Sequence, residues 1–162
     1  MNISDFKYCT NNDKDICLHD CRATHITLNG NNLSFVFDDG FWIINDHSFD
    51  DNKLHKSSLS VMSLSLIEDE YIDSTTVYIF NQKNGETIRG KISINSLIEF
   101  INSEHANLEF IYVFRETQGF RKYSFECVLW SDKMPFHKEC ILSVNANELS
   151  YYWNKVTKDK VW

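Results

Sequence analysis

The sequence contains few of the residues that break strands or favour helices. It has one proline, Pro135, five dispersed glycines and three alanines in 162 residues. Alanine is the strongest helix former, whereas the β-branched and aromatic residues that fit strands are plentiful here. No proline-, glycine- or serine-rich linker divides the chain. We therefore expect residues 1–162 to form a single, β-rich domain.

Positive charge is also scarce. The chain has 16 basic and 23 acidic residues, which gives a net charge of −7 with histidine neutral. Nucleic acids and anionic membranes are bound by proteins that displace counterions with positive charge, so this sequence disfavours both as partners. The same charge favours a basic protein partner.

The chain has no apolar run long enough to span a membrane. Its first residues, from Met1 to Phe6, have neither the positive start nor the apolar centre of a signal peptide. We therefore expect a cytoplasmic protein. The five cysteines are an odd number in such a chain, which predicts reduced thiols, several of them packed as small hydrophobic side chains.

Motifs of the common catalytic and nucleotide-binding sites are missing. The glycines do not form a G-x-G-x-x-G run or a P-loop, and neither G-x-S-x-G nor H-E-x-x-H occurs. We expect no cofactor and no enzymatic activity.

Local patterns predict an antiparallel arrangement in the first part of the chain. Residues 1–16 are polar and predict a loosely packed arm. Residues 23–28, 33–37 and 41–44 predict three strands, joined by Asn29-Gly30-Asn31-Asn32 and by Asp39-Gly40 as tight turns. Three strands joined in this way would form a meander. Residues 59–67 predict a further strand, and its apolar parity changes near Val61, which indicates a bulge there.

One helix is predicted in the second part of the chain. Ile94, Leu97, Ile98 and Ile101 have helical spacing, and Ser96 with Glu99 fits a capping box, which predicts a helix over residues 97–105. Further strands are predicted at 76–80 and 87–92 around an Asn84-Gly85 turn, at 108–114 as a central strand covered on both faces, at 123–129, and at 139–144 and 149–153 as a last hairpin.

These elements define the expected fold class. It is mainly β (α+β): an antiparallel sandwich or strongly curved sheet of about nine to ten strands, with one short helix near residues 97–105.

Cys17, His19 and Cys21 are residue types that bind zinc. In a strand these residues would share one face, but successive members would lie about 6.6 Å apart, too far to converge on one ion. We therefore expect no metal site, but two buried thiols and a hydrogen-bonded histidine at a strand edge. Cys127 is expected to be buried and inert, and Cys140, near His137, is the more exposed thiol.

An interaction protein is the function that the composition favours most. We expect a non-catalytic domain, of the type of an immunity protein, whose acidic surface binds and neutralises a basic bacterial toxin. The expected contact residues are acids of two loops, with an exposed aromatic as anchor. They are Asp46, Asp50, Asp51, Glu68, Asp69, Glu70 and Asp73, with Trp42 and Tyr152.

Two alternatives stay open. A curved sheet could form an aromatic-lined pocket for a small molecule or a reaction, with His19, His25 and His137 as the available acid–base groups. A purely structural subunit could instead form a homodimer through an edge strand or an exposed aromatic face.

Overall fold

The computed structural model confirms the fold class. It describes residues 3–44, 53–68, 73–103, 106–116 and 121–161. These residues form antiparallel strands and one α-helix, together with two single-turn 3-10 helices, η1 (Ile3–Asp5) and η2 (Asp13–Asp15). None of the described helices has the length and apolar character needed to cross a membrane.

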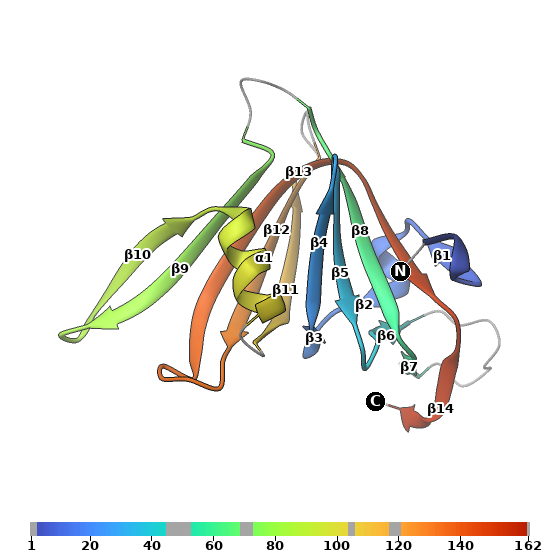
Figure 1. Cartoon of the computed structure of the whole chain (residues 1–162). Helices are drawn as coiled ribbons and strands as arrows, with labels where there is room; N and C mark the ends of the chain where they lie inside the picture. The colour runs from blue at the N-terminus through green and yellow to red at the C-terminus, as the bar shows by residue number, and fades with distance from the viewer. Residues whose placement is uncertain (1–2, 45–52, 69–72, 104–105, 117–120, 162) are drawn as a thin grey trace.

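A large, strongly curved sheet forms most of the molecule (Figure 1). Its main path runs in the order β3-β11-β12-β13-β8-β5-β4, and a hairpin of β9 and β10 extends from one part of β13. The short β1 pairs with another part of β13. The strands are β1 (Tyr8–Thr10), β3 (Cys21–Ala23), β4 (His25–Asn29), β5 (Asn32–Phe37), β8 (Ser60–Leu66), β9 (Thr75–Lys83), β10 (Glu86–Ile92), β11 (Asn107–Glu116), β12 (Lys122–Trp130) and β13 (His137–Trp153).

The strand β13 arches across the whole sheet as one 17-residue element. Its first part pairs with β12 and β9, and its second part pairs with β8 and β1. The predicted hairpin across Asn145-Ala146-Asn147 was therefore wrong. A shift in the register between β13 and β8 falls at this point, between Ala146 and Glu148, so the extra residue forms a bulge and not a turn. The bulge predicted near Val61 is not found, because Val61 pairs in continuous register on both sides.

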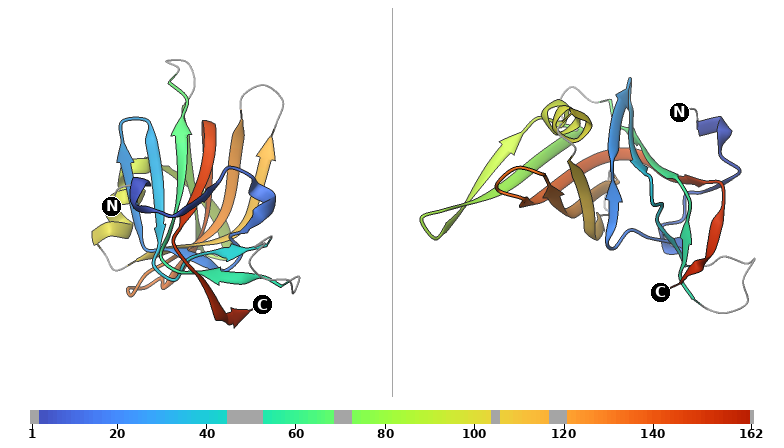
Figure 2. Two further views of the ribbon diagram at one scale, coloured as in Figure 1. Left: turned by 90° about the vertical axis from the view of Figure 1, so that its right-hand side faces the viewer. Right: turned by 60° about the horizontal axis from the view of Figure 1, so that its bottom comes forward.

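A second, four-stranded sheet lies at one end of the large one (Figure 2). Its order is β14-β7-β6-β2, from β2 (Ile16–Cys17), β6 (Trp42–Ile43), β7 (His55–Ser57) and β14 (Val156–Val161). The predicted meander is thus only half right. The strands β4 and β5 form the expected hairpin, but β6 leaves β5 at the Asp39-Gly40 turn and pairs with β7 and β2.

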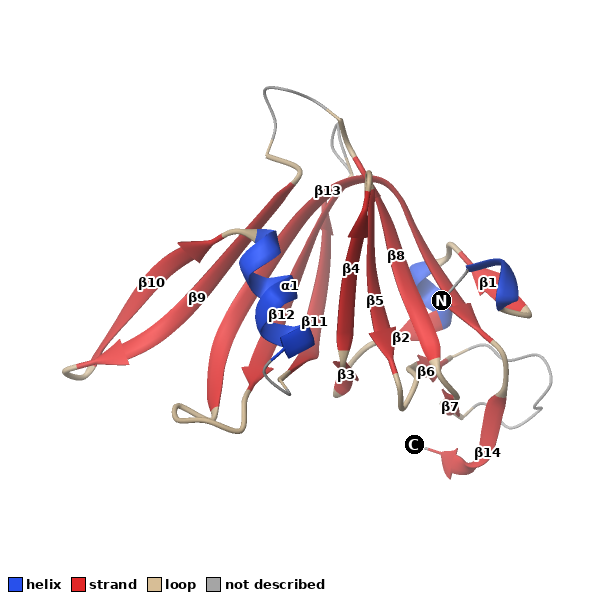
Figure 3. Ribbon diagram, in the orientation of Figure 1, coloured by secondary structure: helices blue, strands red, loops and turns tan. Residues whose placement is uncertain are grey.

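The helix α1 (Ile94–Ser103) packs between β4 and β9 on the inner face of the large sheet (Figures 2 and 3). It begins earlier than predicted, because Ser93 caps it: the Ser96 N–H donates to Ser93 Oγ at 3.0 Å. Asn102 fastens its other end to β4. The Ile26 N–H donates to Asn102 Oδ1 (3.0 Å), and Asn102 Nδ2 donates to the Ile26 carbonyl (2.8 Å).

Aromatic rings fill the core inside the curved sheet. The Phe110 ring contacts those of Phe35, Phe37 and Phe125, with centroids 5.6, 5.5 and 5.4 Å away, and all four side chains are completely buried. Edge-to-face and tilted pairs of this kind add stability beyond the burial of apolar area. Leu97 and Ile101 of the helix belong to the same core.

The N-terminal segment, which we expected to be a loose arm, makes several contacts. The strand β1 pairs with the end of β13, opposite residues Tyr151, Tyr152 and Trp153. In η2, Asp13 forms an ion pair with Arg115 of β11 at 2.9 Å.

The strand β11 is not a central strand along its whole length, as was predicted. Its first part lies between β3 and β12, but the pairing with β3 ends at Phe110. Beyond that point β11 pairs only with β12 among the described strands, and residues 112–116 are exposed. The prediction was wrong because an apolar pattern on both faces is the same for a buried strand and for an edge strand that leaves aromatic side chains exposed.

Gly40 allows the chain to pass from the large sheet to the small one, and its replacement tests this crossing. Its φ is +69°, and a Cβ atom there would collide with the carbonyl oxygens of Ser57 and Ser58. Gly30 also has a positive φ, +57°, but a Cβ atom there would meet no neighbour. We expect Gly30→Ala to cost about 1 kcal/mol and Gly40→Ala several times more, measured as the free energy of unfolding in urea. Equal losses for the two variants would contradict this account.

Candidate interaction surface

The structure describes four of the nine residues that the sequence predicted as contacts. Glu68 and Asp73 lie near Asn145: the Ile67 N–H donates to the Asn145 carbonyl, and Asn145 Nδ2 donates to the Asp73 carbonyl. Both acids are exposed, and Asp73 forms an ion pair with Lys91 at 3.0 Å. The remaining predicted acids lie outside the described residues; they are Asp46, Asp50, Asp51, Asp69 and Glu70.

The two predicted aromatic anchors are half-buried and already have neighbours within the chain. Trp42 lies in β6, where the Lys56 ammonium is 4.6 Å from the centre of its ring. The Tyr152 ring lies 6.3 Å from that of Phe6. Tyr152 pairs with Val61 near the start of β8, whereas Glu68 follows the end of that strand. The described acids, Glu68 and Asp73, are thus not brought together with the two aromatics into one surface.

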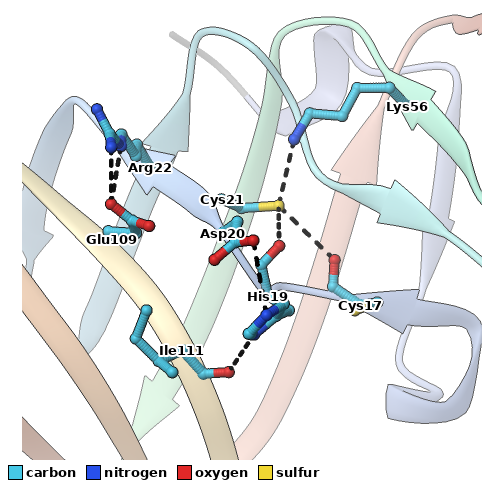
Figure 4. A network of polar contacts seen from close by, with 8 residues as sticks. All are labelled: Cys17, His19, Asp20, Cys21, Arg22, Lys56, Glu109 and Ile111. Carbon is cyan, nitrogen blue, oxygen red and sulfur yellow. Dashed lines mark hydrogen bonds and ion pairs between the residues drawn. The ribbon is translucent and has the colours of Figure 1, made fainter. Parts of the chain in front are cut away.

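The side chains of Cys17, His19 and Cys21 diverge (Figure 4). The segment is not a straight strand, because Asp20 has a φ of 59° and the Cys21 N–H donates back to the Leu18 carbonyl. His19 Nδ1 lies 2.9 Å from the Ile111 carbonyl oxygen of β11, while the Cys21 thiol points inward. Within the described ranges, no three histidine, cysteine or acidic side chains are placed to share a metal ion.

Cys21 has an unusual neighbour in Lys56. The Lys56 side chain is only 7% exposed, and its Nζ donates to Cys21 Sγ at 3.3 Å. Burial raises the pKa of the Cys21 thiol, and the nearby ammonium opposes this rise. Lys56 therefore connects the small sheet to Cys21 of the core, while its ammonium also lies over the Trp42 ring of the same small sheet.

The two thiols of β12 and β13 lie opposite each other inside the core. Cys127 pairs with Cys140, and both are buried, so the prediction that Cys140 is the more exposed thiol was wrong. Cys140 is buried because β13 is a central strand here, between β12 and β9. Burial raises the pKa of Cys140 to about 12 and raises that of Cys127 as well. His137 lies at the start of β13, against the Trp130 ring.

The outer face of the sheet presents a different group of residues. Along β12, Tyr123, Phe125, Cys127 and Leu129 face the core, so Ser124, Glu126 and Val128 face outward. The register places Glu126 opposite Ile141 of β13 and Tyr112 of β11. A depression of about 530 Å³ lies on this face. Its lining includes Phe80, Ile111, Val128 and Ile141, with the carboxylates Glu126 and Glu139.

The two carboxylates of this depression form no ion pair with a described residue. Glu139 pairs with Val128, so it lies diagonal to Glu126 across the β12–β13 ladder, a separation of about 7–8 Å. Both are exposed, and neither forms an ion pair within the described part of the chain. The cations of β10 are engaged elsewhere on this face: Lys91 pairs with Asp73, and Arg89 stacks on the Tyr78 ring at 4.7 Å.

Exposed apolar side chains of β11 border the same face. Tyr112 is 57% and Phe114 54% exposed, and their partners on β12, Glu126 and Ser124, face outward. We call the set of Glu126, Glu139, Ile111, Tyr112 and Phe114 the outer acidic face. It combines unpaired carboxylates with apolar and aromatic contact area, which is the composition of a surface that binds cationic groups.

Comparison with known proteins identifies no relative. No family model, curated protein or solved structure matches the chain.

The buried thiols provide a test of the core. Cys9 is exposed, whereas Cys21, Cys127 and Cys140 are buried. We expect a thiol reagent to modify Cys9 at once at neutral pH and these three only as fast as the protein unfolds, because a protonated, buried thiol is neither nucleophilic nor accessible. Mass spectrometry of the modified peptides measures the order. Rapid labelling of Cys140 in the native protein would contradict its placement.

Alkaline pH should destabilise the fold through the same groups. Because folding raises the pKa of Cys140 from 9.0 to about 12, its contribution is fully present below pH 9 and is lost as pH rises towards 12. The free energy of unfolding should fall by about 1.4 kcal/mol per pH unit for this thiol in that range. Urea denaturation across the range measures the slope, and Cys140→Ala should make it shallower. An unchanged slope in that variant would assign the effect to other groups.

Proposed function

We propose that this protein is a non-catalytic interaction domain that binds a basic partner protein through its outer acidic face. The observation that supports this most strongly is the pair of carboxylates, Glu126 and Glu139, on an apolar depression, neither of which forms an ion pair with a described residue. Lysine or arginine side chains of a partner would supply the missing charges. The apolar lining would contact their aliphatic stems.

The charge of the whole chain supports the same type of partner. A net charge of −7 attracts basic proteins over several ångströms and raises the rate at which they meet the correct face. Toxin domains that cleave nucleic acids are basic because their substrates are anionic. Neutralisation of such a domain, the role of an immunity protein, is the function that we propose.

The predicted acidic loops have a secondary place in this proposal. Asp73 reaches the margin of the outer face through its ion pair with Lys91. Glu68 lies close to it on the other side of Asn145. Glu68 would extend the field of negative charge around Glu126 and Glu139, while these two would make the direct contacts.

A small cationic ligand is the second candidate. The depression of about 530 Å³ lies within the range of ligand pockets, and it combines apolar walls with two carboxylates. An amine with an aromatic or aliphatic body would match that chemistry. Calorimetric titration with such amines tests this candidate, and Glu126→Gln should abolish any heat of binding.

Charge reversal on the outer acidic face tests the proposed function. We expect the double variant Glu126→Lys/Glu139→Lys to lose a basic partner captured from the native host, because like charges then face each other at the contact. The control variant Glu86→Lys/Glu99→Lys makes the same change in net charge at two exposed positions, on β10 and on α1. Immobilised wild-type and variant proteins, with quantitative mass spectrometry of the bound material, provide the measurement.

The salt dependence of partner binding and the binding by the control variant distinguish the possible results. Binding that falls with ionic strength and survives in the control variant supports docking on the outer acidic face. Equal loss in both variants would mean that only the net charge matters. Equal binding by the wild-type protein and the outer-face variant would place the partner elsewhere on the molecule.

A further inference from the structure

The described sheet edges differ in how they are protected against pairing with a strand of another chain. The edge of β4 is covered where Asn102 of the helix occupies the backbone N–H and carbonyl of Ile26. The edge strand β10 carries the charged residues Glu86, Arg89 and Lys91. Covering and charging are the usual ways in which proteins prevent an edge from pairing with another chain.

The second half of β11 is protected less, because its charged residues, Arg115 and Glu116, come only at its end. Its pairing with β3 ends at Phe110, and residues 112–116 are exposed, with the apolar Tyr112, Val113 and Phe114 in succession. The N-terminal segment contacts this half through side chains. The His19 ring lies 6.0 Å from that of Tyr112, and Asp13 pairs with Arg115. No described strand pairs with β11 on this side beyond Phe110.

We propose that the open edge of β11 receives an extended, basic segment of the partner as an added strand, with its cationic side chains over the outer acidic face. This inference rests on the proposed function and specifies how the partner binds. Backbone hydrogen bonds along residues 112–116 would supply affinity, as in other complexes formed by strand addition.

The charge of the outer acidic face indicates that the strand added at β11 carries basic residues. A residue of the added strand opposite Tyr112 would share its face with Glu126, which lies one strand further, about 10 Å from the added backbone. A lysine or arginine at that place spans this distance together with the glutamate side chain and can stack on the Tyr112 ring. A second copy of this chain would bring the same net negative charge to Glu126 and Glu139, so the basic segment is the better occupant.

The test uses a synthetic peptide of alternating arginine and valine, about eight residues long, and the same peptide N-methylated at every residue. The two have equal charge and the same side chains, but the second cannot donate backbone hydrogen bonds. Fluorescence anisotropy with the full chain measures both affinities. We expect the unmodified peptide to bind at least about tenfold more tightly.

A pair of protein variants locates the binding. Phe114→Lys places a cation beside the open edge, and Phe136→Lys makes the same change at an exposed position in the β12–β13 connection. We expect the first variant to weaken the unmodified peptide about tenfold and the second to leave its affinity unchanged. Circular dichroism and the free energy of unfolding confirm that both variants are folded.

The outcomes separate this inference from the proposed function. Equal affinity of the two peptides, both lost in Glu126→Lys/Glu139→Lys, would overturn strand addition and leave the acidic docking face intact. A chain that is dimeric in light scattering and becomes monomeric in Phe114→Lys would assign the edge to a second copy and also overturn it. No peptide binding, together with a host partner unaffected by the charge reversal, would contradict both proposals.

Discussion

The continuity of β13 is the constraint on which the rest of the structure depends. One strand pairs with β12 and β9 in its first part and with β8 and β1 in its second, so both parts of the sheet share a backbone. Its bulge at Asn147 lets the sheet curve there while the ladder continues. The curvature brings Phe35 and Phe37 of β5 against Phe110 of the other part, and Phe110 also packs on Phe125.

The same curvature determines which side chains lie on the outer face of the sheet. Side chains alternate along β12, so the residues that fill the core force Glu126 and Val128 to the outside. The register of β12 with β13 then places Glu139 diagonal to Glu126. The outer acidic face is therefore a direct consequence of how the core is packed. Its two carboxylates come from the strands β12 and β13.

Features determined by neighbouring residues could be predicted from the sequence. The β4–β5 and β9–β10 hairpins were predicted correctly, because Gly30, Asn84 and Gly85 supply the positive φ angles of their turns. The Asn145-Ala146-Asn147 segment has the same local chemistry, but distant residues decide its conformation. The Asn145 N–H donates to the Ser74 carbonyl and the Ala146 N–H to that of Arg121. Such partners cannot be inferred from one sequence without the register of the sheet.

In the candidate site, too, some features follow from neighbouring residues and others from the pairing of distant strands. The alternation along β12 was visible, and it would have placed Glu126 outside once Tyr123 and Phe125 were assigned to the core. Predicting that Glu139 lies beside Glu126 would have required the register between β12 and β13. The residues between these two strands do not determine that register. Tyr112 and Phe114 were assigned to a covered strand, because the sequence alone could not show that β3 ends its pairing at Phe110.

The two bonds between Asn102 and Ile26 also have a consequence for stoichiometry. The side-chain amide satisfies the backbone of β4 as a neighbouring strand would, so the sheet ends there. A chain with two open edges can add copies of itself in sequence and grow into a filament. With β4 closed by the helix and β10 charged, these two edges would not add further partner segments or copies of the chain once a strand is bound at β11.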